Sequence, residues 1–267
     1  MRLLPNYNRP GVGISKNAPE KREFFKFFQY FFGNFWKLFV SNVWILLLSV
    51  PLLTIGLGQV GAAYVCRTVA RDKQYFGTSD FFSAIKRNWK RSLGLGIINL
   101  LINVIFYFNI ITILAGMAGT QQYIMLGATA FVYVIVSFAR FYQYTLAITF
   151  DFTVFQIIKN SLLLATAGLK KNFLIGICLV LNYGFVFLCF LYFGSIGAAL
   201  GTLYLLLIFP IFRMYLIQFN VFPVIKKQII DPYYENNPDA DKDKRRALGI
   251  LEDDEEDKSV FSDEELL

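Results

Sequence analysis

Residues 93–115 read LGLGIINLLINVIFYFNIITILA, and no charged side chain occurs from residue 93 to residue 139. A helix crosses the hydrocarbon core of a bilayer, about 30 Å thick, in about 20 residues. This charge-free window is therefore long enough for two crossings. The stretch 115–122, AGMAGTQQ, supplies an uncharged turn between them. The sequence predicts a membrane-spanning helical hairpin, with spans near 93–115 and 123–149.

Two further charge-free windows, 38–65 and 172–212, lie on either side of this hairpin. The second window is interrupted by GSIG at 194–197, which predicts spans near 173–193 and 198–220. Strands of a membrane barrel would alternate apolar and polar residues over about ten positions, and the run 203–208 does not alternate. We therefore predict an all-α, polytopic transmembrane helical bundle. It would have about five full spans plus one short or re-entrant helix, with cytoplasmic amphipathic helices.

The window 38–65 is too short for two full crossings, because 28 residues of helix measure only about 42 Å. We predict one nearly full helix over 33–54 and a shorter return helix over 58–71. The predicted helix-break and packing residues share a helix-interrupting or small side chain: Pro51, Gly56, Gly58 and Gly61. Gly58 and Ala62 lie four residues apart and would allow close helix packing. The alternative is a single kinked crossing with the N-terminus outside.

The composition excludes several classes of enzyme. Of 267 residues, 56% are hydrophobic and 17% charged, whereas soluble domains carry about 25% charge. The chain has no histidine, so Ser-His-Asp, Cys-His and histidine–metal chemistries are absent. Residues 56–61 fit the G-x-G-x-x-G pattern but lack the βαβ context that a dinucleotide site needs. We expect no enzyme, no catalytic residue, no cofactor and no metal site, and we expect the three cysteines to pack in the core.

The distribution of Lys and Arg predicts the orientation in the membrane. The segments before 38, over 66–92, over 151–172 and after 225 are net basic or begin with basic residues, whereas both predicted turns are uncharged. Basic segments favour the cytoplasmic side, so both termini should be cytoplasmic. We expect a flexible basic segment over 1–23, a transmembrane helical domain over 24–227 and an acidic, disordered cytoplasmic tail over 228–267. No nucleic-acid partner is expected.

Two amphipathic segments, 79–91 and 153–171, should lie at the inner membrane surface. In the first, Phe81, Phe82, Ile85 and Trp89 recur at helical spacing and basic side chains occupy the other faces, a pattern typical of interfacial helices. They would bind anionic lipid headgroups in the bilayer or, alternatively, dock a partner. The candidate contact residues are basic or aromatic: Lys86, Arg87, Trp89, Lys90, Arg91, Lys170 and Lys171.

Arg140 and Arg213 are the charges that lie nearest to membrane depth. Both are expected toward the inner boundary, where long side chains can reach the headgroups. The alternative is that both converge on an anionic lipid, a substrate group or a partner carboxylate. No Asp or Glu occurs over 81–150 or 152–230, which argues against a proton- or cation-coupled transporter.

Several of these stretches carry a resemblance to a known family. They are Trp44, SVPLLTIG at 49–56, AAY at 62–64, the segment 81–90, and FD at 150–151 with KNSL at 159–162. On them the chain resembles the YesL-like family of bacterial integral membrane proteins, a domain of unknown function, over about residues 25–225. The resemblance implies a helical protein of the bacterial cytoplasmic membrane that is associated with carbohydrate uptake.

From this resemblance we expect a non-enzymatic accessory or assembly factor for carbohydrate uptake, with an ABC importer permease as its partner. The alternative is a stand-alone channel or carrier for a small neutral solute. The family has no catalytic residues that could be carried over to this sequence.

Overall fold

The structure is a computed structural model that describes residues 22–236, and this part of the chain is helical without any strand. The α-helices are α1 (Glu23–Gly33), α2 (Phe35–Ser49), α3 (Ile55–Ala70), α4 (Thr78–Gly116), α5 (Gly119–Thr149), α6 (Val154–Ala167), α7 (Leu169–Leu207), α8 (Phe209–Ile225) and α9 (Asp231–Asn236). A 3-10 turn, η1 (Leu52–Thr54), precedes α3, and a π-helical turn, η2 (Lys226–Ile230), follows α8. The all-α prediction is confirmed.

Four helical segments are long and apolar enough to cross a membrane. They are Leu52–Ala70, α4, α5 and α7. The pair α1 and α2, bent by 72° at Asn34, adds a fifth candidate if it forms one broken span. The structure thus agrees with a polytopic membrane protein of four to five spans. The predicted span 198–220 is divided between the end of α7 and α8.

Both predicted turns occur where glycine and small residues interrupt the apolar windows. The α4–α5 hairpin reverses around Met117 and Ala118, and Gly119 has a φ of +64°. The second hairpin reverses at Gly194, which has a φ of +55° and a ψ of −129°. Residues with side chains rarely adopt such positive φ values, so glycine permits both reversals.

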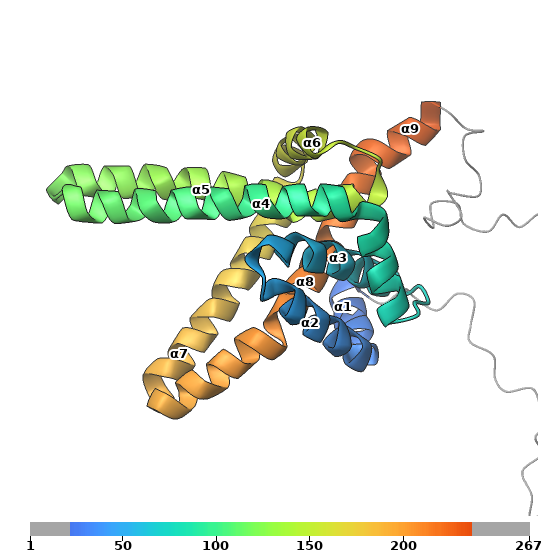
Figure 1. Cartoon of the computed structure of the whole chain (residues 1–267), viewed down its shortest axis with the longest axis horizontal. Helices are drawn as coiled ribbons and strands as arrows, with labels where there is room; N and C mark the ends of the chain where they lie inside the picture. Colours follow the sequence, from blue (N-terminus) through green and yellow to red (C-terminus); the bar gives the residue numbers. More distant parts are fainter. Residues whose placement is uncertain (1–21, 237–267) are drawn as a thin grey trace, which may run out of the picture.

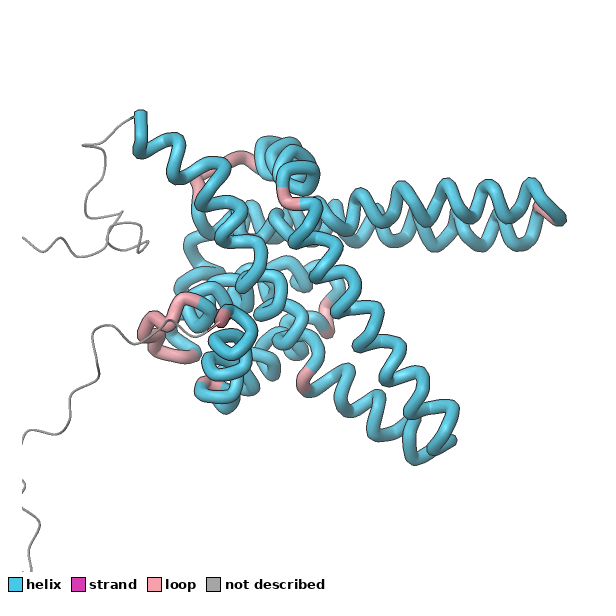
Figure 2. Tube along the Cα trace, turned by 180° about the vertical axis from the view of Figure 1, so that it is seen from behind, coloured by secondary structure: helices cyan, strands magenta, loops and turns pink. Residues whose placement is uncertain are grey.

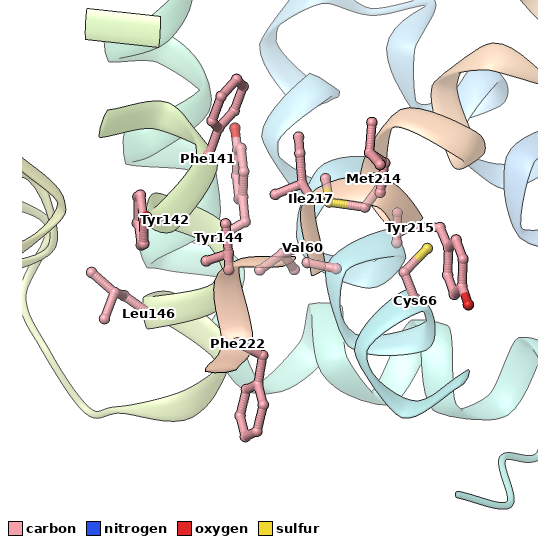
Figure 3. Packing of buried hydrophobic residues seen from close by; sticks show 14 of the residues in the cluster. Val60, Cys66, Phe141, Tyr142, Tyr144, Leu146, Met214, Tyr215, Ile217 and Phe222 are labelled. Carbon is pink, nitrogen blue, oxygen red and sulfur yellow. The ribbon is translucent and has the colours of Figure 1, made fainter. Parts of the chain in front are cut away.

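Helix α3 lies at the centre of the core, where it packs against α2, α4, α5 and α8. Val60, Val65 and Cys66 on α3 are fully buried. Figure 3 shows Val60 and Cys66 among residues of α5 and α8. Tyr215 of α8 is also buried, and its hydroxyl donates a hydrogen bond to the Phe27 carbonyl at 3.0 Å. The core therefore ties α1 and α8 to the central helix.

The helix break is narrower than the sequence predicted. The chain leaves α2 after Ser49, turns through Pro51 and η1, and enters α3 at Ile55. The Thr54 hydroxyl donates to the carbonyls of Leu48 at 2.5 Å and Pro51 at 2.8 Å, which holds the turn. The three glycines predicted to break the helix, Gly56, Gly58 and Gly61, instead lie inside α3.

These helical positions need glycine because α2 and α4 approach them closely. A side chain at Gly61 would come within 2.7 Å of the Phe81 ring, and one at Gly56 would collide with the Ser92 backbone. A side chain at Gly58 would contact Ile45 of α2 at 3.4 Å. Because α2 and α3 pack on each other, the two helices form a hairpin, which favours the broken hairpin over the single kinked crossing.

The two long hairpins diverge from the common core, as Figures 1 and 2 show. Helix α7 packs mainly against α8, with smaller contacts to α2 and α6, but not extensively against α4 or α5. In the most apolar 18-residue window of each helix, 6% of the residues of α4, 6% of those of α7 and 17% of those of α5 are buried. The flanks of both hairpins are therefore apolar and largely exposed.

The predicted domain limits differ from the helix limits at the C-terminal end. The acidic tail was predicted to begin at residue 228, but helical structure continues through η2 and α9 to Asn236. Most of the predicted N-terminal segment, residues 1–21, and most of the predicted tail, residues 237–267, lie outside the described residues.

Candidate functional site

Arg140 of α5 and Arg213 of α8 lie in the same region of the fold, where the charges of both act on Tyr144 of α5. Arg213 Nη2 donates to Gln59 Oε1 of α3 at 3.3 Å. Arg140 Nη1 donates to Asn103 Oδ1 at 2.7 Å, and Arg140 Nη2 to the Asn99 carbonyl at 3.3 Å. We call the two arginines together with Gln59, Asn99 and Asn103 the arginine junction. The structure thus brings together two arginines that lie far apart in the sequence.

Buried neighbours hold the junction in place. Arg140 follows Phe138 and Ala139, which are both buried, and its guanidinium lies 5.8 Å from the centroid of the Tyr133 ring. Asn99 Nδ2 donates to Gln143 Oε1 at 2.7 Å, which fixes α4 against α5. Asn99 and Asn103 therefore link α4 to α5, and both bind Arg140.

The hydrogen bonding of the junction is incomplete. Arg140 Nε and Asn99 Oδ1 are buried without a hydrogen-bond partner in the described part of the chain. Two ion pairs occur elsewhere in residues 22–236, Arg91 with Asp151 and Lys171 with Glu23, and neither involves Arg140 or Arg213. Two like charges without a counter-ion are costly in a medium of low dielectric constant. The junction is therefore suited to an anion.

The basic segment that begins α4 has exposed side chains. Lys86, Arg87 and Lys90 are exposed, and Trp89 is 49% exposed. The Arg87 guanidinium lies 5.5 Å from the centroid of the Tyr64 ring, and Lys90 Nζ lies 5.5 Å from that of Trp89. The contact of these four residues with headgroups or a partner stays a prediction.

Arg91 differs from its neighbours because it turns toward the protein. Its Nη1 donates to the Phe150 carbonyl at 2.9 Å, and its Nη2 forms an ion pair with Asp151 Oδ1 at 2.7 Å. Cations stabilise helix C-termini, where carbonyl groups lack partners. Arg91 therefore closes the C-terminal end of α5, which is a different role from the predicted lipid or partner contact.

The second amphipathic segment forms α6 and the start of α7. Thr153 and Gln156 make a capping box at the start of α6. Lys170 is exposed, whereas Lys171 pairs with Glu23 Oε2 of α1 at 3.3 Å. No hydrogen bond or ion pair within residues 22–236 connects this group to the basic residues of α4, so the two predicted contact groups are separate surfaces.

The sequence did not reveal a cavity of about 290 Å³ that is lined by three basic residues. Lys26 of α1, Arg71 after α3 and Lys171 of α7 surround it, together with Glu23. The Arg71 guanidinium lies 4.6 Å from the centroid of the Phe222 ring, and burial lowers the pKa of Arg71. Because these residues come from distant segments, no local spacing could have indicated the cavity.

Arg67 is another basic residue that the sequence did not single out. Its side chain is 7% exposed and donates to Thr149 Oγ1 at 2.7 Å, joining α3 to the end of α5. Its guanidinium also lies 5.6 Å from the centroid of the Tyr64 ring. Arg67 therefore has partners within the fold and acts as a structural cation.

The described residues contain no cluster of three or more His, Cys, Asp or Glu side chains that could hold a metal ion. Cys66, Cys178 and Cys189 are all free thiols, and Cys66 is buried in the core.

The match to a known family covers only part of the chain. Residues 37–110 match a family described as a protein of unknown function, DUF624. No curated protein and no solved structure matches the chain. The matched residues run from α2 through α3 into α4, so they include the central helix and the basic segment of α4. Over these helices, the chain is similar to a family whose function is uncharacterised.

Proposed function

We propose that this chain is a non-enzymatic, multi-pass protein of the bacterial cytoplasmic membrane, with both termini in the cytoplasm. In this proposal it assembles with another membrane protein, the permease of a carbohydrate ABC-type importer, as an accessory or assembly factor. The observation that carries the proposal is the arginine junction, which lies where two apolar hairpins diverge. The resemblance described above suggests the carbohydrate importer.

The charge balance of the chain supports a partner that supplies a carboxylate. Between residues 81 and 230 the only acidic residue is Asp151, and it pairs with Arg91. A cation costs up to about 2.5–3.5 kcal/mol at the centre of a bilayer on insertion scales, and less toward the boundary. An Asp or Glu on a partner helix could offset part of this cost and bond the buried Arg140 Nε.

The shape of the molecule supports the same proposal. Few residues of the apolar flanks of α4, α5 and α7 are buried, and the hairpins do not close on each other. A partner helix that packs between them would reach the arginine junction at the base of the gap.

Co-purification with candidate permeases tests the proposal. The full-length, tagged protein is co-expressed with the permease, and recovery of the permease is compared between variants. We expect the double variant Arg140→Gln, Arg213→Gln to recover about tenfold less permease, which corresponds to about 1.4 kcal/mol. The double variant Arg140→Lys, Arg213→Lys keeps both charges and should retain most of the binding. Lys159→Gln removes an exposed charge on α6 and serves as the matched control.

Two results would contradict the proposal. Equal recovery with the glutamine variant, while that variant remains inserted, would exclude the arginines as the docking group. Sugar uptake by liposomes that contain this protein alone would instead favour the stand-alone carrier.

A further inference from the structure

Two adjoining cavities lie between α1, α7 and α8. The first is the basic cavity of about 290 Å³. The second is an apolar groove of about 620 Å³, lined mainly by aromatic and aliphatic side chains that include Phe28, Leu174, Phe185, Phe212 and Leu216. Both are lined by Glu23, Lys171 and Phe219. The basic cavity therefore adjoins the apolar groove, and Lys171 lines both of them.

The groove has the length of one membrane leaflet. Along α7 its lining runs from Lys171 to Phe185, and fourteen residues of helix span about 21 Å. Half of a bilayer, including its headgroup region, measures about 20–22 Å. A chain of methylene groups that enters the groove beside Lys171 would therefore remain within the leaflet on that side of the membrane.

The charge of the first cavity favours an anion. Basic side chains line it more than acidic ones: Lys26, Arg71 and Lys171 face one carboxylate, Glu23. Lys171 Nζ already lies 3.3 Å from Glu23 Oε2, but Glu23 is 78% exposed, so a phosphate could displace it. Phosphate oxygens accept strong charge-assisted hydrogen bonds from Lys and Arg, and basic pockets between membrane helices bind anionic headgroups.

We infer that this composite site binds one anionic phospholipid of the inner leaflet. Its phosphodiester lies against Lys26, Arg71 and Lys171, and one acyl chain occupies the apolar groove. A zwitterionic lipid would fill the groove without balancing the charge, and free phosphate would balance the charge without filling the groove. The assignment to the inner leaflet rests on the proposed orientation, but the inference is independent of any partner protein.

Native mass spectrometry and thermal unfolding of the full-length protein test the site. The detergent-purified protein is incubated with phosphatidylglycerol or with phosphatidylcholine of the same acyl chains. We expect phosphatidylglycerol to be retained preferentially and to raise the unfolding temperature more. Each basic residue near a membrane surface contributes roughly a fivefold change in binding. Arg71→Gln and Lys171→Gln should therefore each lower retention about fivefold, whereas Lys159→Gln, outside both cavities, should have no effect.

A further variant tests the groove separately from the charge. Leu181 lines the groove and is 67% exposed, so Leu181→Trp should fill space with little effect on the core. We expect this variant to lower retention of both lipids.

Three results would overturn the inference. Equal retention of the two lipids by the wild-type protein, which needs no variant, would exclude a selective anionic site. Stabilisation by inorganic phosphate equal to that by phosphatidylglycerol would assign the cavity to a free anion. Unchanged lipid retention in Leu181→Trp would exclude the groove as the acyl-chain site.

Discussion

Single side chains complete the backbone hydrogen bonding where the membrane helices break. Pro210 lies at the start of α8, and the chain leaves helical geometry at Ile208. The fully buried Asn42 of α2 donates through Nδ2 to the carbonyls of Leu206 at 3.0 Å and Leu207 at 2.8 Å. Its Oδ1 accepts from the Ile211 amide at 3.1 Å. Unpaired backbone groups are costly in hydrocarbon. By bonding these groups, Asn42 lowers the free-energy cost of the break between α7 and α8.

Asn42→Leu should therefore destabilise the protein strongly. Each buried group left without a partner costs about 1–3 kcal/mol, and this variant affects several such groups. Thermal unfolding in a fixed detergent should show a clearly lower midpoint. Asn88→Leu is the matched control, because Asn88 bonds only to the Ala84 carbonyl of its own helix, at 3.0 Å. Equal midpoints for Asn42→Leu and the wild type would show that the break is stabilised by other contacts.

The sequence could not identify Asn42 or the inward turn of Arg91. Asn42 bonds to groups 164 or more residues away, and Arg91 bonds to residues that follow a different helix. Such residues have the same local pattern as surface polar residues. Arg140 and Arg213 were identifiable from the sequence, because a lone charge beside a long apolar window is conspicuous without knowledge of its neighbours.

At the scale of elements, α3 shows how tertiary packing changes the meaning of a local pattern. The sequence GLGQVG at 56–61 indicates a helix break, since glycine in a helix interior costs roughly 0.5–1 kcal/mol relative to alanine. In the folded chain, α4 approaches so closely that a side chain at Gly56 would meet the backbone of both Ser92 and Gly96. Close packing of small residues is a main source of helix association in membranes, and here it offsets the low helix propensity.

Gly56→Ala should separate α3 from α4. Overpacking typically costs about 1–3 kcal/mol, so the yield of folded protein and its unfolding midpoint should both fall. Gly127→Ala on α5 is the control, since a side chain there meets nothing within 4 Å. Its effect should be neutral or slightly stabilising because alanine favours the helix. A Gly56→Ala variant as stable as Gly127→Ala would contradict the close α3–α4 contact.

At the scale of the whole molecule, charge-free windows and glycines predicted the helices but not how the helices are arranged. The spans, both hairpin turns and the break at Pro51 depend on local composition, which the sequence records directly. The divergence of the hairpins, the arginine junction and the basic cavity depend on contacts between distant segments. Residues 26, 71 and 171 converge only because α1, α3 and α7 pack around a shared core, and no spacing in a single sequence encodes that convergence.

The orientation of the molecule gives the last prediction. Basic residues gather at the core end of the hairpins, and the uncharged reversals around Ala118 and Ser195 lie at the far ends. Because basic segments favour the cytoplasm, the reversals should face outward. Single cysteines at Ala118 and Ser195, in a background without the native thiols, should react with an impermeant thiol reagent in intact cells.

In the same background, cysteines at Lys86 and Lys159 should react only after the membrane is permeabilised. A cysteine at Arg22 should behave like these two if α2 and α3 form a hairpin, because the chain then enters and leaves on the cytoplasmic side. Labelling at residue 22 with protection at residue 86 would instead require a single crossing before α4. Labelling at Lys86 and Lys159 with protection at Ala118 would show that the orientation is the reverse of the proposed one. The basic cavity would then face the outer leaflet.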